Sequence, residues 1–90
     1  MDFERYPGGS LVRQGLEDLA AGRETDAALL VLVGAPRLMR LGISVPTGPA
    51  RVEHRLFERL AREDPRAAHS RYNALIRALV SFERAAECAG

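Results

Sequence analysis

A run of seven consecutive apolar residues, 27–33, constrains this 90-residue chain more than any other feature. The run has no polar face, so it must be buried on all sides, either as a central helix or as a central strand. A strand needs partners, and no second convincing strand pattern occurs in the sequence. Thr25 is a suitable N-cap, and the two alanines that open the run favour helix. We therefore expect a buried helix, with residues 29–33 at its centre, that ends at Gly34.

Apolar residues at helical spacing predict a first helix that begins at Ser10, an expected N-cap, and ends before Gly22. Gly22 would supply the left-handed stop. Gly15 lies inside this helix, where glycine costs about 1 kcal/mol relative to alanine, and we expect it to mark a close helix crossing. Pro36 fits the first turn of a short helix over residues 36–41.

Two longer helices are expected after a connector at residues 43–48. Pro49 is expected to open the first of them. The apolar face of this helix comprises Val52, Leu56, Phe57 and Leu60. Asp64 as cap and Pro65 as first helical residue predict the start of the last helix, which should extend to about Glu87. The two helices should form an antiparallel hairpin.

These elements predict an all-α fold, a single domain over residues 1–90 with four main helices, a short helical turn and an irregular arm at residues 1–9. Hydrophobic residues make up 47% and charged residues 28% of the chain, which is typical of soluble globular proteins. No stretch approaches the roughly 20 apolar residues that cross a bilayer. The first residues do not have the pattern of a signal peptide.

The composition indicates a bacterial source, but it does not identify a binding partner. All 13 basic residues are arginine, alanine is abundant and asparagine occurs once, as is typical of GC-rich bacterial genomes. The net charge of +1 indicates neither a nucleic-acid field nor a membrane surface. A single cysteine, Cys88, excludes an internal disulfide and a cysteine-built zinc site. We expect a cytoplasmic protein without a cofactor.

A regular row of arginines should lie on one face of the helix that follows Pro49: Arg51, Arg55, Arg59 and Arg62. Such a face could follow a phosphate backbone or bind an acidic partner. The alternative is a solvated face, because Glu58 lies one turn before Arg62 and Glu63 one turn after Arg59. No aromatic residue interleaves the row to stack on bases.

The last helix is expected to overhang the helix before it, because it is the longer of the two. The overhang carries apolar side chains that must be covered, either by the first two helices or by a second copy of the chain. A two-fold dimer is the commonest closed assembly. We therefore predict a homodimer with the following residues at its interface and rim: Leu79, Phe82, Ala78, Ala85 and Arg84.

Two other patterns have a less specific spacing. His54 and Glu58 are four residues apart and could bind a divalent metal with His69 from a facing helix, but a surface ion pair is the alternative and we expect no metal. Arg37 and Arg40 could belong to the second helix of a helix–turn–helix motif. Six residues span only about 9 Å, which is short for a recognition helix.

Arg62 and His69 are separated by six residues, and Asn73 follows one turn later. This spacing loosely resembles the active-site motif of HEPN-type ribonucleases, which are helical and often come from bacterial defence or toxin systems. The resemblance implies a ribonuclease site at these residues and covers this stretch alone. Asp64 and Pro65 depart from the motif, because they break the helix between the arginine and the histidine. We do not assign the chain to this family.

No Ser/His/Asp or Cys/His arrangement and no glycine-rich phosphate loop is present in the sequence. We therefore predict a small non-catalytic helical module for protein interaction or oligomerisation, with an unknown protein partner. The alternatives are a nucleic-acid-binding protein that uses the arginine row, and a HEPN-like ribonuclease or toxin component.

Overall fold

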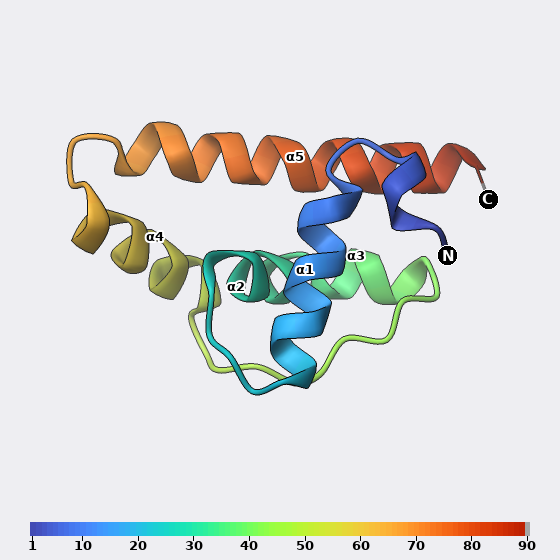
Figure 1. Cartoon of the computed structure of the whole chain (residues 1–90), viewed down its shortest axis with the longest axis horizontal. Helices are drawn as coiled ribbons and strands as arrows, with labels where there is room; N and C mark the ends of the chain where they lie inside the picture. The colour runs from blue at the N-terminus through green and yellow to red at the C-terminus, as the bar shows by residue number, and fades with distance from the viewer. Residues whose placement is uncertain (90) are drawn as a thin grey trace.

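The computed structural model describes residues 1–89, and within that range every regular element is a helix (Figure 1). This confirms the all-α prediction. The elements are the 3-10 helix η1 (Phe3–Arg5) and the α-helices α1 (Gly9–Ala20), α2 (Asp26–Val33), α3 (Ala35–Arg40), α4 (Val52–Glu63) and α5 (Ala68–Ala89). None of these helices is both long and apolar enough to cross a membrane.

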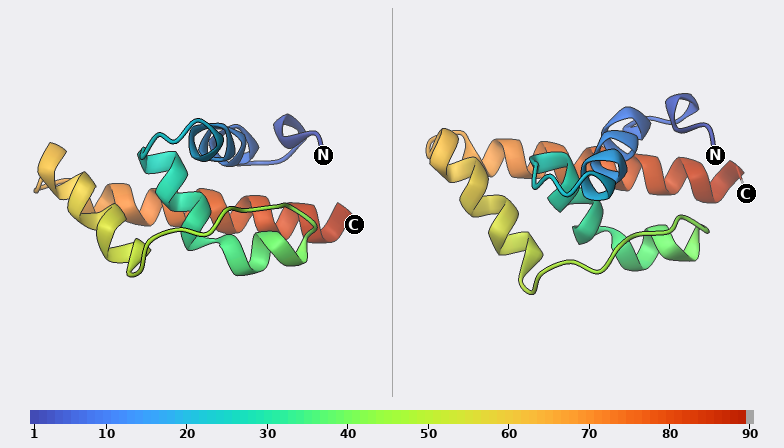
Figure 2. Two further views of the ribbon diagram at one scale, coloured as in Figure 1. Left: turned by 90° about the horizontal axis from the view of Figure 1, so that it is seen from below. Right: turned by 60° about the horizontal axis from the view of Figure 1, so that its bottom comes forward.

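The apolar run forms the buried helix α2, as expected. Thr25 caps it, because its hydroxyl oxygen accepts a hydrogen bond from the Ala28 amide at 3.1 Å. Leu29, Leu30 and Val31 are at most 1% exposed. The surrounding helices α1, α4 and α5 all pack against α2 (Figure 2). This short helix is therefore the centre of the fold.

The predicted close helix crossing at Gly15 is confirmed. A Cβ atom at this position would collide with the carbonyl oxygen of Ala27 and with a methyl group of Val31. Glycine therefore lets the backbone of α1 lie directly on α2. The predicted stop is confirmed as well, since Gly22 follows the helix with a left-handed φ of 74°.

Asp18 fixes the connection between α1 and α2. It is only 3% exposed, and its carboxylate accepts hydrogen bonds from the Thr25 hydroxyl at 2.6 Å and from Gln14 and Arg23 at 3.0 Å each. These donors, with Thr25 foremost, hold the pKa of Asp18 below its ordinary value, although burial acts in the opposite direction. The N-cap of α2 is thus joined to the end of α1.

The start of α1 differs from the prediction that Ser10 is the N-cap. The helix begins at Gly9, after Gly8 in a left-handed conformation with a φ of 73°. The Ser10 hydroxyl instead donates a hydrogen bond to the Glu4 carboxylate at 2.8 Å. The glycine pair permits this earlier start, because a Cβ atom at Gly9 would collide with the carbonyl group of Phe3.

The start of α4 also differs from the prediction. The helix begins at Val52 rather than at Pro49. Arg51 has a left-handed φ of 56°, which a right-handed helix cannot include. The connector before α4 is therefore longer than expected. Ile43 and Val45 are buried and hold this connector against the core.

The start of α5 lies three residues beyond the predicted Pro65, at Ala68. Asp64 is not the cap of this helix. Its carboxylate accepts a hydrogen bond from the Arg66 amide at 3.1 Å, so it stabilises a turn that precedes α5. At the other end α5 continues to Ala89, slightly past the predicted end.

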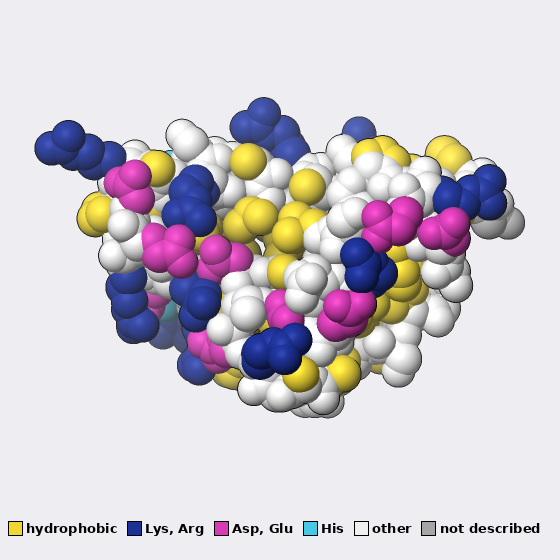
Figure 3. Space-filling view, in the orientation of Figure 1, with side chains coloured by type: hydrophobic (Ala, Val, Ile, Leu, Met, Phe, Trp, Pro, Cys, Tyr) yellow, Lys and Arg dark blue, Asp and Glu magenta, His cyan; other side chains and the backbone are white. Residues whose placement is uncertain are grey.

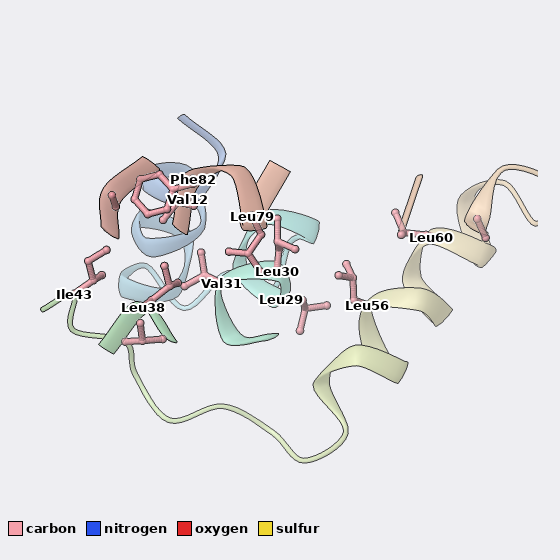
Figure 4. Packing of buried hydrophobic residues seen from close by; sticks show 13 residues of the cluster. Val12, Leu29, Leu30, Val31, Leu38, Ile43, Leu56, Leu60, Leu79 and Phe82 are labelled. Carbon is pink, nitrogen blue, oxygen red and sulfur yellow. The ribbon is translucent and has the colours of Figure 1, made fainter. Parts of the chain in front are cut away.

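The hairpin of α4 and α5 is open. The two helices are joined by the turn at residues 64–67 and diverge from it (Figure 2). α4 packs more extensively on α2 than on α5. Leu56 and Leu60 of α4 are completely buried in the core cluster that includes α2 (Figure 4). The antiparallel pairing is therefore close only near the turn.

The C-terminal half of α5 is covered by the same chain. Phe82 is 0% exposed, and its ring lies 5.7 Å from the ring centre of Phe3 and 5.9 Å from that of Tyr6. Val12 of α1 lies beside Phe82 in the core (Figure 4). The expected overhang is thus closed by the N-terminal arm and α1, which was the intrachain alternative.

Candidate functional site

A groove of about 290 Å³ lies between α3 and the middle of α5. Leu38 is completely buried, so the opposite face of the short helix α3 is turned away from the core. This places Pro36 and the arginines of α3 along one wall of the groove. The apolar lining comprises Val33, Pro36, Ile76, Leu79 and Val80. The groove is therefore an apolar surface that the chain leaves uncovered.

Glu83 lines this groove and is a buried carboxylate. Only 4% of its side chain is exposed, and the nearest cation is Arg37, whose Nη1 atom lies 3.5 Å from Oε1 of Glu83. Within residues 1–89 no hydrogen bond is donated to this carboxylate. Burial raises the pKa of Glu83 above its ordinary value, and the positive charge of Arg37 only partly offsets this.

Arg37 joins α3 to the end of α5 through a second carboxylate. Its Nε and Nη2 atoms donate hydrogen bonds to the two oxygens of Glu87 at 2.6 and 2.9 Å. This two-point contact lowers the pKa of Glu87. Arg40, one turn further along α3, also lines the groove but takes part in no ion pair within residues 1–89. The groove therefore carries charges of both signs.

The predicted arginine row on α4 is partly neutralised. Arg55 pairs with Glu24 at 2.7 Å and Arg59 with Asp26 at 2.8 Å. Glu24 precedes α2 and Asp26 is its first residue, so these carboxylates could not be found from the spacing within α4. The expected pair of Arg62 and Glu58 is present at 3.9 Å, and Glu63 contacts Arg71 instead of Arg59. Arg51 lies outside the helix and is exposed.

The predicted alternative for His54 and Glu58, a surface ion pair, is present in the structure. His54 contacts Glu58 on the exposed face of α4. The ring of His69 instead lies 4.9 Å from the ring centre of Phe57. Among the described residues no group of three or more histidine, cysteine or acidic side chains could hold a metal ion.

The residues that resemble the HEPN motif are not joined into a site. Arg62 reaches back to Glu58 on its own helix, whereas His69 packs on Phe57. Asn73 is exposed on α5. In the described part of the chain no hydrogen bond or ion pair connects these side chains.

The helix–turn–helix alternative is not supported by the packing. The first of its two helices, α2, is buried at the centre of the fold. Arg37 of the second, α3, is engaged with Glu83 and Glu87 on α5. Arg37 is therefore held against α5 and is not free to contact bases as a recognition helix requires.

The residues predicted for self-association fall into two groups. Leu79 and Phe82 are buried within one chain, and Ala78 lies against Gly8 at the start of α1. Phe82 and Ala78 are therefore covered by the N-terminal segment. Ala85 is half-buried and Arg84 is exposed, and Leu79 forms part of the groove lining. The groove therefore shares Leu79 with the predicted patch and lies beside the rest of it.

No protein-family model, curated protein or solved structure matches the chain. The two candidate surfaces differ in their chemistry. The α4 face is filled by ion pairs, whereas the groove combines an open apolar lining with a buried carboxylate. The groove between α3 and α5 is the better candidate site.

Sequence reasoning missed Glu83 as a site residue. Arg37 lies 46 positions earlier in the chain, and no local pattern links the two. One signal was present: Glu83 is an acidic residue between the seam positions Leu79 and Ala86 of an amphipathic helix, where a polar side chain is unusual. The burial of this carboxylate distinguishes the groove from the ion-paired face of α4.

Proposed function

We propose that this chain is a small non-catalytic helical module that self-associates through the groove between α3 and α5. The observation that carries the proposal is the open apolar lining of this groove, which the buried carboxylate of Glu83 also lines. Ile76 and Val80 are only half-buried there, while the neighbouring Phe82 is closed off by the N-terminal arm.

The charges of the groove favour a second copy as the partner. A two-fold interface places one surface patch against itself, so a charged patch suits it only if it carries both signs. Arg40 and Arg84 are exposed beside the groove, and Glu87 is partly exposed at its end. A two-fold axis can bring these groups of one copy opposite those of the other. The bacterial source and the cytoplasmic location stay predictions from the composition.

Sedimentation at micromolar concentrations tests the proposal. The wild-type chain is expected to have the mass of two chains, and Val80→Glu the mass of one, because the variant buries a charge in the interface. Met39→Glu is the matched control. Met39 is 56% exposed but does not line the groove, so this variant should stay dimeric.

Circular dichroism must show that Val80→Glu is folded. If it is not, Pro36→Asp provides the same test, since Pro36 is exposed and an acidic residue suits the first turn of α3. A wild-type chain that sediments as a monomer at all concentrations contradicts the proposal, as does a dimer that survives both groove variants.

A further inference from the structure

The solvent side of α5 carries a row of polar side chains, which we name the α5 basic stripe. Its members in the helix are Ser70, Asn73, Arg77, Ser81 and Arg84, and Arg66 stands in the turn before it. All six residues are exposed. Their spacing of three and four residues keeps the helical members within an arc of about 80°. The stripe is therefore straight and spans about 21 Å from Ser70 to Arg84.

The α5 basic stripe contains no carboxylate. The acidic residues in the second half of α5, Glu83 and Glu87, turn toward Arg37 on α3. Within residues 1–89 none of the three stripe arginines takes part in an ion pair, whereas Arg55 and Arg59 on α4 are both paired. In Figure 3, basic side chains project beyond the upper edge along α5, while basic and acidic side chains alternate over α4 on the left.

We propose that the α5 basic stripe binds the phosphate backbone of a nucleic-acid duplex without reading its sequence. Every side chain in the stripe is a hydrogen-bond donor, and arginine, serine and asparagine are the residue types that contact phosphates. The stripe has no apolar centre, which a protein interface would need. It also has no aromatic side chain on which unpaired bases could stack, which favours duplex over single strands.

The salt dependence of such binding follows from the number of arginines. Three phosphate contacts predict a slope of about −2.7 for the logarithm of the binding constant against the logarithm of salt concentration. The affinity should then fall about 40-fold between about 50 and about 200 mM salt. This surface lies beside the groove of the proposed function and shares only Arg84 with the charged groups named there. Duplex binding by the stripe does not require self-association.

The test compares two double variants with the same change in charge. Arg66→Glu/Arg77→Glu alters the stripe, and Arg51→Glu/Arg62→Glu alters the α4 side, where neither residue makes a close ion pair. Binding to a mixed-sequence DNA duplex is measured by fluorescence anisotropy across the salt range. The stripe variant should lose most binding, with at most about a 3.5-fold salt effect from the one arginine left. The α4 variant should keep the wild-type slope.

Three results overturn the inference. The first is that the wild type binds no duplex at about 50 mM salt, where phosphate contacts are strongest. The second is that both double variants lose the same amount of duplex affinity. The third is that the wild type binds poly-glutamate in preference to the duplex, which would indicate an acidic protein partner. Pro36→Asp separates this inference from the proposed function, because it alters the groove from α3 and adds no charge to α5. A monomeric Pro36→Asp variant should keep the wild-type salt slope, so the failure of one proposal can be told from the failure of the other.

Discussion

The rings of Phe3 and Phe82 stack with their centres 5.7 Å apart and their planes inclined by 25°. These residues lie near opposite ends of the chain, and Tyr6 adds an edge-on contact to Phe82 at 5.9 Å. The N-terminal arm is therefore part of the core. The contact also explains why the long helix α5 does not need a second copy to cover Phe82.

Removal of this contact should destabilise the fold. Phe82→Ala is expected to lower the free energy of unfolding by about 3–5 kcal/mol, because a large buried ring leaves a cavity. Phe3→Ala should cost less, since Phe3 is only half-buried. A double-mutant cycle by urea unfolding should give a coupling of about 0.5–1.5 kcal/mol. A Phe3→Ala variant as stable as wild type would show that the arm does not close the core.

Thr25 and Ser10 should respond differently to the same substitution. Thr25→Ala removes the N-cap of α2 and the hydroxyl that donates to Asp18, so it should cost about 0.5–2 kcal/mol or slightly more. Ser10→Ala removes only an exposed hydrogen bond to Glu4 and should change stability by less than about 0.5 kcal/mol. Thermal unfolding monitored by circular dichroism compares the two. Equal losses would mean that Ser10 caps α1 after all.

Gly15→Ala should destabilise the protein even though alanine is the better helix former. The added methyl group would meet the Ala27 carbonyl and force α1 away from α2, at an expected cost of about 1–3 kcal/mol. The gain in helix propensity is only about 1 kcal/mol. Chemical denaturation measures the difference. A more stable variant would contradict the close crossing.

Glu83 and Glu87 should give opposite pH dependences. The pKa of Glu83 is raised in the folded state by burial, with Arg37 and Arg40 acting against this shift and Glu87 reinforcing it. Stability therefore falls as the pH rises from the unfolded-state pKa through the raised value. Glu83→Gln removes this loss, so the variant should be more stable than wild type at neutral pH and similar to it at acid pH.

Glu87→Gln is the matched control. The pKa of Glu87 is lowered, mainly by its hydrogen bonds from Arg37, so its contribution is present above the unfolded-state pKa and is lost in acid. This variant should be slightly less stable than wild type at neutral pH, with the difference disappearing as the pH falls. Denaturation series at several pH values test both residues. A Glu83→Gln variant less stable at neutral pH would contradict the assigned burial effect.

Local signals in the sequence were sufficient where the deciding atoms are neighbours along the chain. Thr25 bonds the Ala28 amide three residues later, and Gly22 supplies its own left-handed backbone, so both helix boundaries were predictable. The helix starts predicted at Ser10 and Pro49 were wrong, because contacts with residues outside these helices decide where they begin. Gly9 packs against Phe3, and Arg51 takes a left-handed turn while the connector before it is anchored to the core.

The sequence by itself determined that the chain is helical and that residues 27–33 form its centre, because periodicity and an all-apolar run act within a few turns. Only the tertiary structure decided which charges are free. Arg55 and Arg59 find carboxylates more than 30 positions away, whereas Arg77 on α5 meets none within residues 1–89. Side chains distant in sequence become partners only through packing, so the groove and the α5 basic stripe are properties of the fold.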